Sequence, residues 1–293
     1  MEDGRMALHA HPGRASRLGR TSLDDRSKGQ RMDFGLTGKV ALITGGSDGI
    51  GKAAALSLVR EGARVAIVAR RQDKLDAAEA EIRAAGGDVI GISCDVMDEA
   101  QVKAAVAQVA AKWGGIDILV NNAGTSAARK FEDVTDEVWE TDLGIKVFGA
   151  INCSRAAIPF MKAAGSGRII NITTGGGKAP GAGSLPTSMA RAAGIALTKA
   201  MSRDYAGDNI LVNTVCIGVI KSGQHERRYE AMQERDPTRT LDEFYAGMGE
   251  RVPLGRVGEA AEAGDVICFL ASARASYITG TAINIDGGSS PVV

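Results

Sequence analysis

Residues 44–51, Thr-Gly-Gly-Ser-Asp-Gly-Ile-Gly, are the part of the sequence whose residue types most directly indicate chemistry. They follow an apolar run and precede a segment rich in Ala and Leu, the pattern of a strand, a glycine-rich turn and a helix. Such a turn can hold a pyrophosphate, because free backbone N–H groups and the positive end of the helix dipole both attract the anion. Gly45 would turn the chain off the strand, Gly49 would let the backbone approach the phosphates, and Gly51 would let the helix pack closely on the sheet. We therefore predict that a pyrophosphate-bearing cofactor binds at Gly45, Ser47, Asp48, Gly49, Ile50 and Gly51.

The segments around this turn alternate between apolar strands and helices. Strands that are apolar throughout and separated by helices indicate a parallel sheet that is covered on both faces. The sequence therefore predicts an α/β fold, a single domain built on one Rossmann-type doubly wound parallel sheet of about seven strands. The predicted strands are 39–44, 65–69, 88–94, 116–120, 168–173, 210–216 and 282–285, and the predicted helices are 52–62, 73–85, 99–113, 137–164, 185–205 and 259–271.

Two segments depart from this alternation. Residues 1–31 hold seven Arg or Lys and four Asp or Glu without the apolar stretch of a signal peptide, so we predict a disordered extension. The folded domain is expected to span residues 32–293, starting at Met32. Within it, residues 219–251 are polar and helical in character and are predicted to form a lid over the site.

Composition narrows the classes of partner. The formal net charge is zero and the pI is about 6.8, which argues against nucleic acid and anionic membrane surfaces, and no apolar run is long enough to span a membrane. The four cysteines lie in apolar segments without paired spacing, as expected for buried free thiols in the cytoplasm: Cys94, Cys153, Cys216 and Cys268. With only three histidines, no metal site is expected.

Further motifs follow the glycine turn in a fixed order: Asp95-Val96, then Asn121-Asn122-Ala123-Gly124, Val212-Asn213 and Ile285-Asp286-Gly287-Gly288. From about residue 38 to the end, this combination resembles the short-chain dehydrogenase/reductase family. The resemblance implies an NAD(P)-dependent oxidoreductase that acts on a small carbonyl or alcohol substrate and forms a homo-oligomer, either a dimer or a tetramer. It also implies cofactor contacts from Asp95, Val96, Asn122, Ala123, Gly124, Arg191, Gly218, Ile220 and Ser222. From the residues alone, Asp95 and Asn121 could instead cap or brace strand ends.

The end of the second predicted strand bears on the choice of nicotinamide cofactor. An acidic residue there would bind the ribose 2′-OH of NAD, but this chain has Ala69 followed by Arg70 and Arg71. A guanidinium can bind a 2′-phosphate through two hydrogen bonds, so NADP is favoured over NAD. Asp48 is an opposing charge near the same ribose, and both arginines could simply be solvated.

The catalytic positions implied by the resemblance are altered. The family uses a serine after the fifth strand, a tyrosine thirteen residues later, a lysine four residues after that, and an asparagine on the preceding long helix. Here these positions hold Thr174, Thr187, Arg191 and Lys146. The threonine hydroxyl is a much weaker acid than a phenol, and arginine does not release its proton near neutral pH, so the ordinary tyrosine–lysine pair is absent.

Three functions remain open from the sequence. We favour an oxidoreductase with a rebuilt proton donor, for which Lys146, Lys178, His225 and Tyr229 are candidates. The second is a non-redox lyase, isomerase or hydrolase in which Arg191 and Lys146 bind an oxyanion. The third is a non-catalytic NADP-binding protein.

Two further roles also stay open. Arg191 is either a fixed cation beside the nicotinamide ribose or a structural arginine bonded to carbonyls. The lid arginines either steer an anionic substrate or belong to a solvated helix: Arg227, Arg228 and Arg235.

Overall fold

The structure is a computed structural model that describes residues 32–293. Within these residues, seven parallel strands form one sheet in the order β3-β2-β1-β4-β5-β6-β7. The predicted extension over residues 1–31 lies outside the described residues. The predicted fold class is confirmed, and six of the seven strands differ from the prediction by one or two residues at one or both ends. The strands are β1 (Val40–Thr44), β2 (Arg64–Ala69), β3 (Val89–Ser93), β4 (Ile118–Asn121), β5 (Gly167–Thr174), β6 (Ile210–Ile217) and β7 (Ala282–Ile285).

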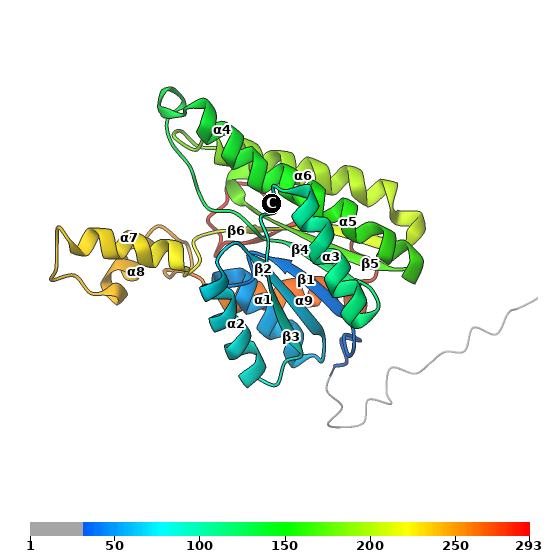
Figure 1. Cartoon of the computed structure of the whole chain (residues 1–293). Helices are drawn as coiled ribbons and strands as arrows, with labels where there is room; N and C mark the ends of the chain where they lie inside the picture. The colour runs from blue at the N-terminus through cyan, green and yellow to red at the C-terminus, as the bar shows by residue number, and fades with distance from the viewer. Residues whose placement is uncertain (1–31) are drawn as a thin grey trace, which may run out of the picture. The chain divides into compact units, whose positions relative to one another are not determined.

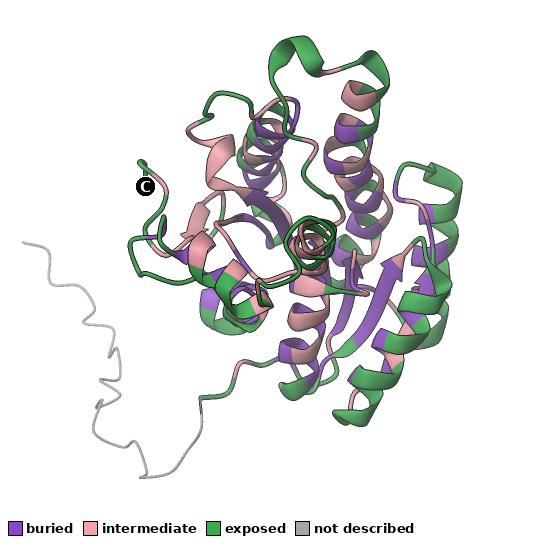
Figure 2. Ribbon diagram, turned by 90° about the vertical axis from the view of Figure 1, so that its left-hand side faces the viewer, coloured by how far each residue is buried: buried purple, intermediate pink, exposed green. Residues whose placement is uncertain are grey.

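Helices cover both faces of the sheet (Figure 1). On one face α1 (Gly49–Arg60), α2 (Gln72–Ala84) and α9 (Ala260–Ala271) pack on inward-facing residues such as Ala41 and Ile43. On the other face α3 (Glu99–Trp113), α5 (Gly149–Ala164) and α6 (Thr187–Asp204) pack on the alternate residues, Val40 and Leu42. Because successive strand residues point to opposite faces, a strand that is apolar throughout contributes to two cores. Figure 2 shows the central strands as the most deeply buried part of the described chain.

The strand order reverses between β1 and β4, and this is where parallel α/β sheets form their binding crevice. The segments after these two strands are tied together. Asn122 Nδ2 donates to the carbonyl oxygens of Thr44 (3.1 Å) and Gly45 (3.0 Å). Thr44 Oγ1 accepts from the backbone N–H groups of Asn122 and Ala123, each at 3.0 Å. The glycine turn is therefore held directly against the end of β4.

The long helix predicted over 137–164 is interrupted. It consists of α4 (Asp136–Leu143), a π-helical turn η2 (Gly144–Phe148) and α5. The π turn packs against the loop after β3, and a glycine lies at each end of this contact. A Cβ added at Gly144 would lie 2.5 Å from Met97 Cε, and one added at Gly149 would lie 2.6 Å from Val96 Cγ2, so neither position has room for a side chain. The π turn contains Lys146, and such turns often reorient a side chain at a functional site.

The insertion at 219–251 forms two helices, α7 (Gly223–Gln233) and α8 (Leu241–Gly249), which Figure 1 shows as a pair projecting beyond the sheet. Thr240 caps α8 by accepting from Glu243 N at 3.2 Å. The rings of Tyr229 and Phe244, 5.8 Å apart, join the two helices. Across residues 32–293, every helix is too short or too polar to traverse a lipid bilayer.

Candidate active site

A cavity of about 620 Å³ runs along the ends of the strands, from the glycine turn to the start of α6. Its volume is in the range of ordinary small-molecule sites. All the predicted cofactor-binding residues except Gly51 line it. They are Gly45, Ser47, Asp48, Gly49, Ile50, Arg70, Arg71, Asp95, Val96, Asn122, Ala123, Gly124, Arg191, Gly218, Ile220 and Ser222.

Gly51 acts by packing. A Cβ added there would overlap Gly45 O and lie 2.6 Å from Asn122 Nδ2, so a larger residue would displace the turn. Gly49, with φ +51°, begins α1 and leaves its face open, the nearest atom to an added Cβ being Ser222 Cβ at 3.7 Å. A closely packed turn with an open helix N-terminus is the arrangement that a pyrophosphate requires, so these residues fit a dinucleotide cofactor.

The adenosine end of the cavity carries Arg70 and Arg71 directly after β2, both exposed. The opposing charge of Asp48 is partly engaged. Its Oδ1 accepts a hydrogen bond from Gly49 N at 2.7 Å. Its Oδ2 lies against Gly223, where an added Cβ would overlap Oδ2 and would be 3.5 Å from Arg227 Nη1. This part of the cavity is therefore predominantly positive.

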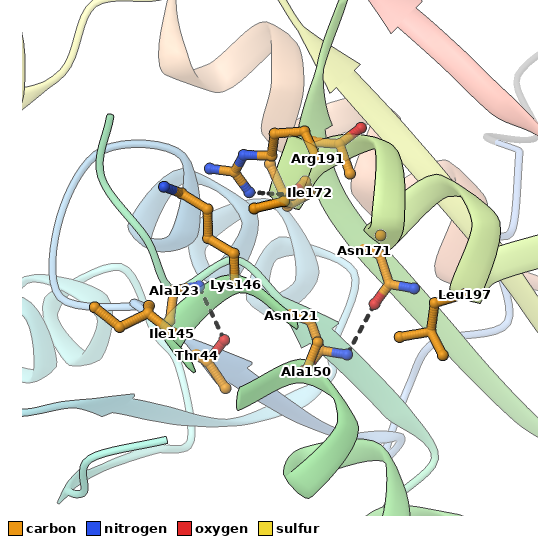
Figure 3. Close-up of a pocket in the computed structure, with 13 residues that line it drawn as sticks. Thr44, Asn121, Ala123, Ile145, Lys146, Ala150, Asn171, Ile172, Arg191 and Leu197 are labelled. Atoms are coloured by element: carbon orange, nitrogen blue, oxygen red, sulfur yellow. Dashed lines mark hydrogen bonds between the residues drawn. The ribbon is translucent and has the colours of Figure 1, made fainter. Parts of the chain in front are cut away.

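Two predicted residues also brace the backbone, as the alternative interpretation proposed. Asp95 Oδ1 accepts from Met97 N at 3.0 Å, which holds the turn after β3 while Asp95 lines the cavity. Asn121 Nδ2 donates to Asn171 Oδ1 at 2.9 Å, linking the neighbouring strands β4 and β5 (Figure 3). Asn121 is a strand brace outside the main cavity.

At the other end of the cavity, Thr174, Thr187 and Arg191 come together as the spacing predicts. Thr174 ends β5, whereas Thr187 and Arg191 lie one turn apart on α6. Thr187 Oγ1 accepts from Ala127 N at 2.9 Å, which fixes the loop after β4 over the start of α6. Arg129 N reinforces this link by donating to Leu185 O at 2.8 Å.

Lys146 reaches the same place from η2. Its Nζ donates to Thr187 Oγ1 at 3.3 Å and forms a buried ion pair with Asp142 Oδ1, one helical turn earlier. Thr187 Oγ1 also lies 3.3 Å from Asp142 Oδ1. Burial, followed by repulsion from Arg191, lowers the pKa of Lys146 to about 7, although the ammonium group is paired with the Asp142 carboxylate. Asp142, Lys146 and Thr187 thus form a hydrogen-bonded chain whose last member lines the cavity.

Arg191 is bonded to a backbone carbonyl and also lines the main cavity. Its Nη1 donates to Ile172 O at 2.6 Å, which is the structural role. Burial lowers the pKa of its guanidinium to about 10, so the group remains charged at neutral pH. Arg191 and Lys146 both line a small cavity of about 20 Å³, with room for a single water molecule, and Figure 3 shows their charged groups near each other at one edge of it. Gly124 lies between them, since a Cβ added there would be 3.1 Å from Lys146 Cγ and 3.5 Å from Arg191 Nη2.

The other candidate proton donors are placed differently. Lys178 Nζ donates to Ala282 O at 2.7 Å and to Asn284 Oδ1 at 2.6 Å, so it anchors β7 and does not line the cavity. Tyr229 donates to Arg239 O within the lid. His225 does line the cavity, but its Nδ1 lies 2.9 Å from Ile220 O, and burial lowers its pKa.

The three arginines of the 219–251 insertion also differ in their positions. Arg227 and Arg228 line the cavity, whereas Arg235 does not. The four cysteines are free and buried, as predicted, and burial raises the pKa of Cys94 to about 11.

The sequence analysis missed Asp142. Its distance of four residues from Lys146 was visible, because residues at that spacing meet on a helix face. The missing signal was burial: both side chains are only 2% exposed, so this pair is not an ordinary solvated one.

Comparison with known proteins agrees with this geometry. The model of the enoyl-(acyl carrier protein) reductase family matches residues 45–290. The 3-oxoacyl-[acyl-carrier-protein] reductase FabG of Thermotoga maritima is 35% identical over 253 residues, which cover 86% of this chain and 98% of that protein. The chain belongs to the short-chain dehydrogenase/reductase family. The family predicted from the motifs is therefore confirmed.

Solved structures of this family superpose on most of the chain. A short-chain oxidoreductase from Pseudomonas aeruginosa PAO1, described as containing an atypical catalytic center, is 36% identical with a TM-score of 0.83, over 88% of this chain and 99% of that one. A second structure of the short-chain oxidoreductase from Pseudomonas aeruginosa PAO1 with an atypical catalytic center contains bound NADPH. The L-sorbose reductase of Gluconobacter frateurii, in complex with NADPH and L-sorbose, is 31% identical with a TM-score of 0.85, over 89% of this chain and all of that one.

Proposed function

We propose that this member of the short-chain dehydrogenase/reductase family is an NADP(H)-dependent oxidoreductase that interconverts a small carbonyl compound and its alcohol. The observation that carries the proposal is the hydrogen-bonded chain from Asp142 through Lys146 to Thr187, which meets the cavity beside Thr174 and Arg191. The NADPH complexes of two relatives support the choice of cofactor, as do the two arginines after β2.

The residues that would hold the cofactor follow from the cavity lining. Gly49 and the start of α1 would face the pyrophosphate, Arg70 and Arg71 the 2′-phosphate, and Asp95 and Val96 the adenine. A bound nicotinamide would supply the hydride that carbonyl reduction requires. Gly218 and Ile220, which line the same cavity, would border its ring.

The chain's own groups move the proton. In the reduction, the Thr187 hydroxyl turns from Asp142 to the substrate oxygen and gives it a proton, while Lys146 Nζ gives a proton to Thr187 Oγ1. Because both transfers belong to one step, the threonine never carries a negative charge, and the weak acidity of its hydroxyl is not limiting. Lys146 is left neutral and regains a proton from solvent. The oxidation runs through the same steps in reverse.

Charge and hydrogen bonding complete the site. Arg191 keeps its positive charge beside the developing oxyanion, and the Thr174 hydroxyl is available as a second donor to it. Lys146 suits the role of donor, since its lowered pKa brings the ammonium group closer to neutral pH than that of an exposed lysine.

The substrate class is drawn from the relatives. FabG is named for 3-oxoacyl groups, and the Gluconobacter enzyme binds L-sorbose; both substrates carry a carbonyl group. A dimeric or tetrameric assembly and a cytoplasmic location, both expected from the sequence, remain part of this proposal.

Lys146→Arg tests the proton donor, because arginine keeps the charge and can keep the pair with Asp142 but does not release a proton. We expect NADPH-dependent reduction of a carbonyl panel containing L-sorbose and a 3-oxoacyl thioester to fall by about 10²–10⁴-fold. Calorimetry should show unchanged NADPH affinity. Lys178→Met is the control: it removes a lysine bonded to β7, and activity per folded molecule should be retained. Full activity in Lys146→Arg would rule out the mechanism.

A further inference from the structure

We propose that Asp142 is a positioning residue which keeps Lys146 protonated and aims its ammonium group at Thr187. This inference rests on the proposed function, in which Lys146 is the proton donor. The residue is not among those predicted from the sequence, and it does not line the main cavity.

The geometry of the pair is specific. Asp142 and Lys146 are four residues apart, and each side chain is 2% exposed. One carboxylate oxygen, Oδ1, contacts both the Lys146 ammonium and the Thr187 hydroxyl, the latter at 3.3 Å. This single oxygen therefore holds the Lys146 ammonium group next to the Thr187 hydroxyl that it would protonate. The distance from Lys146 Nζ to Thr187 Oγ1 is 3.3 Å.

The charges around Lys146 explain why a carboxylate is needed. From α6, Arg191 presents a second cation across the small cavity that both residues line. A further cavity of about 320 Å³ borders the pair on its other side, where it is also lined by Arg129 and Glu137, both exposed. Asp142 is the one carboxylate in contact with Lys146 among the described residues. Without it, burial and Arg191 would both favour the neutral amine, which cannot donate a proton in the reduction.

The second oxygen of Asp142 strengthens the argument. Oδ2 is buried and has no hydrogen-bond partner among residues 32–293. A carboxylate placed only for stability would usually have both oxygens satisfied, because an unmade hydrogen bond in the interior is costly. Within the described residues, the contacts of this carboxylate with Lys146 and Thr187 are therefore made by Oδ1 alone.

Titration of Lys146 in the free protein tests the inference without any substrate. The lysine side chains are labelled with ¹³C at Cε, and the Lys146 signal is assigned by its loss in Lys146→Arg. In Asp142→Asn, which preserves shape and removes the charge, the titration midpoint should fall by about one pH unit or more. An unchanged midpoint would overturn the inference.

Glu99→Gln is the matched control. Glu99 and Lys103 form an ion pair of the same spacing on α3, but their side chains are 58% and 67% exposed. Because the charge of Glu99 is screened by water, the Lys146 signal should titrate at the same pH in this variant as in the wild type.

Two further measurements cover the remaining outcomes. If Asp142→Asn does not fold, Asp142→Asn/Lys146→Met removes both charges; recovery of folding would identify the unpaired lysine as the cause and support the inference. Failure of the double variant to fold would make the carboxylate structural and overturn the inference.

Where turnover is measured, Asp142→Asn should lower kcat for reduction and move the alkaline limb of the kcat profile to lower pH, with KM for NADPH unchanged. Full activity of Lys146→Arg would contradict the proposed function. If Lys146→Arg is inactive but Asp142→Asn has a normal kcat and a normal Lys146 titration midpoint, only the role of Asp142 is contradicted.

Discussion

The two ends of the main cavity are built in different ways. At the end next to α1, the binding groups are largely backbone, and their placement depends on missing side chains: Gly45 and Gly51 are glycine because Asn122 and the turn itself occupy the space of a Cβ. At the end next to α6, the proposed active groups are side chains that come from separate elements: Lys146 from η2, Thr187 from α6 and Thr174 from β5. The first end matches the family pattern, whereas the second has replaced its proton-transferring groups.

The difference shows which part of such a site can change while the fold is kept. A backbone cradle leaves little choice of residue, since any side chain would displace it. A proton donor only has to present an acidic hydrogen at the right point, and different groups meet that requirement from different elements. Charge is also handled differently, because Arg70 and Arg71 are exposed, whereas Lys146 and Arg191 are buried. Buried charges interact more strongly than screened ones, so changes at the α6 end should have the larger effects.

The largest effect is expected from Thr187→Val, which keeps the shape of the residue and removes its hydroxyl. The relay from Lys146 would be broken, and carbonyl reduction should fall by about 10²–10⁴-fold. Thr187→Ser retains the hydroxyl and should keep most of the activity. Steady-state assays of both variants decide the point. Equal activity of the valine and serine variants would show that Lys146 does not act through this residue.

The pH dependence of the two directions is expected to be opposite. Reduction needs the ammonium form of Lys146, so its rate should decrease about tenfold per pH unit above the Lys146 pKa. Oxidation needs the neutral amine, so its rate should increase as the pH rises towards that pKa and level off above it. Burial and Arg191 lower that pKa, so the change should fall below the ~10.4 of an ordinary lysine. Profiles of kcat in both directions measure it. Parallel profiles for the two directions would count against a lysine donor.

At the glycine end, Gly51→Ala should destabilise the protein by about 1–3 kcal/mol, because the added methyl group meets the backbone of the turn. NADPH affinity should decrease with it. Gly115→Ala is the control, since nothing lies within 4 Å of a Cβ added there, and its change in unfolding free energy should stay within about 0.5 kcal/mol. Urea unfolding and calorimetric titration provide the two readouts. A Gly51→Ala protein of wild-type stability would show that the turn can relax.

The smallest effect is expected from Arg70→Glu, since the side chain is exposed and screened by salt. NADPH should bind about tenfold more weakly and NADH nearly as before, in keeping with one lost charge-assisted contact. Titrations at low and high salt should show the NADPH preference shrinking as salt increases. Arg203→Glu, an exposed position on α6 outside the cavity, should leave both affinities unchanged. If NADPH and NADH bind equally to the unmodified protein, the assignment of the two arginines is wrong.

Some features of the site could be predicted because their signals are local in the sequence. The glycine turn, the two arginines after β2 and the positions of Thr174, Thr187 and Arg191 all follow from counting along single strands and helices. The long helical stretch predicted over 137–164 is present, but its π turn had no signal in the sequence pattern; the glycines at its two ends, Gly144 and Gly149, contact the loop after β3. Lys178 was a reasonable candidate donor by its place after Thr174, but its partners are on β7, more than a hundred residues later.

The sequence by itself determined the alternating fold, the cofactor cradle and the loss of the tyrosine–lysine pair, because periodicity and short motifs are set by neighbouring residues. Only the tertiary structure brought together the three residues that we propose in place of that pair. Thr187 lies 45 residues from Asp142 and 41 from Lys146, and the three meet because α6 packs beside η2 on the same face of the sheet. Burial then distinguishes Asp142 and Lys146 from the solvated pair Glu99 and Lys103, which has the same spacing. Spacing along a helix fixes which side chains can meet, whereas the surrounding packing fixes whether their charges are screened by water or are free to act on each other.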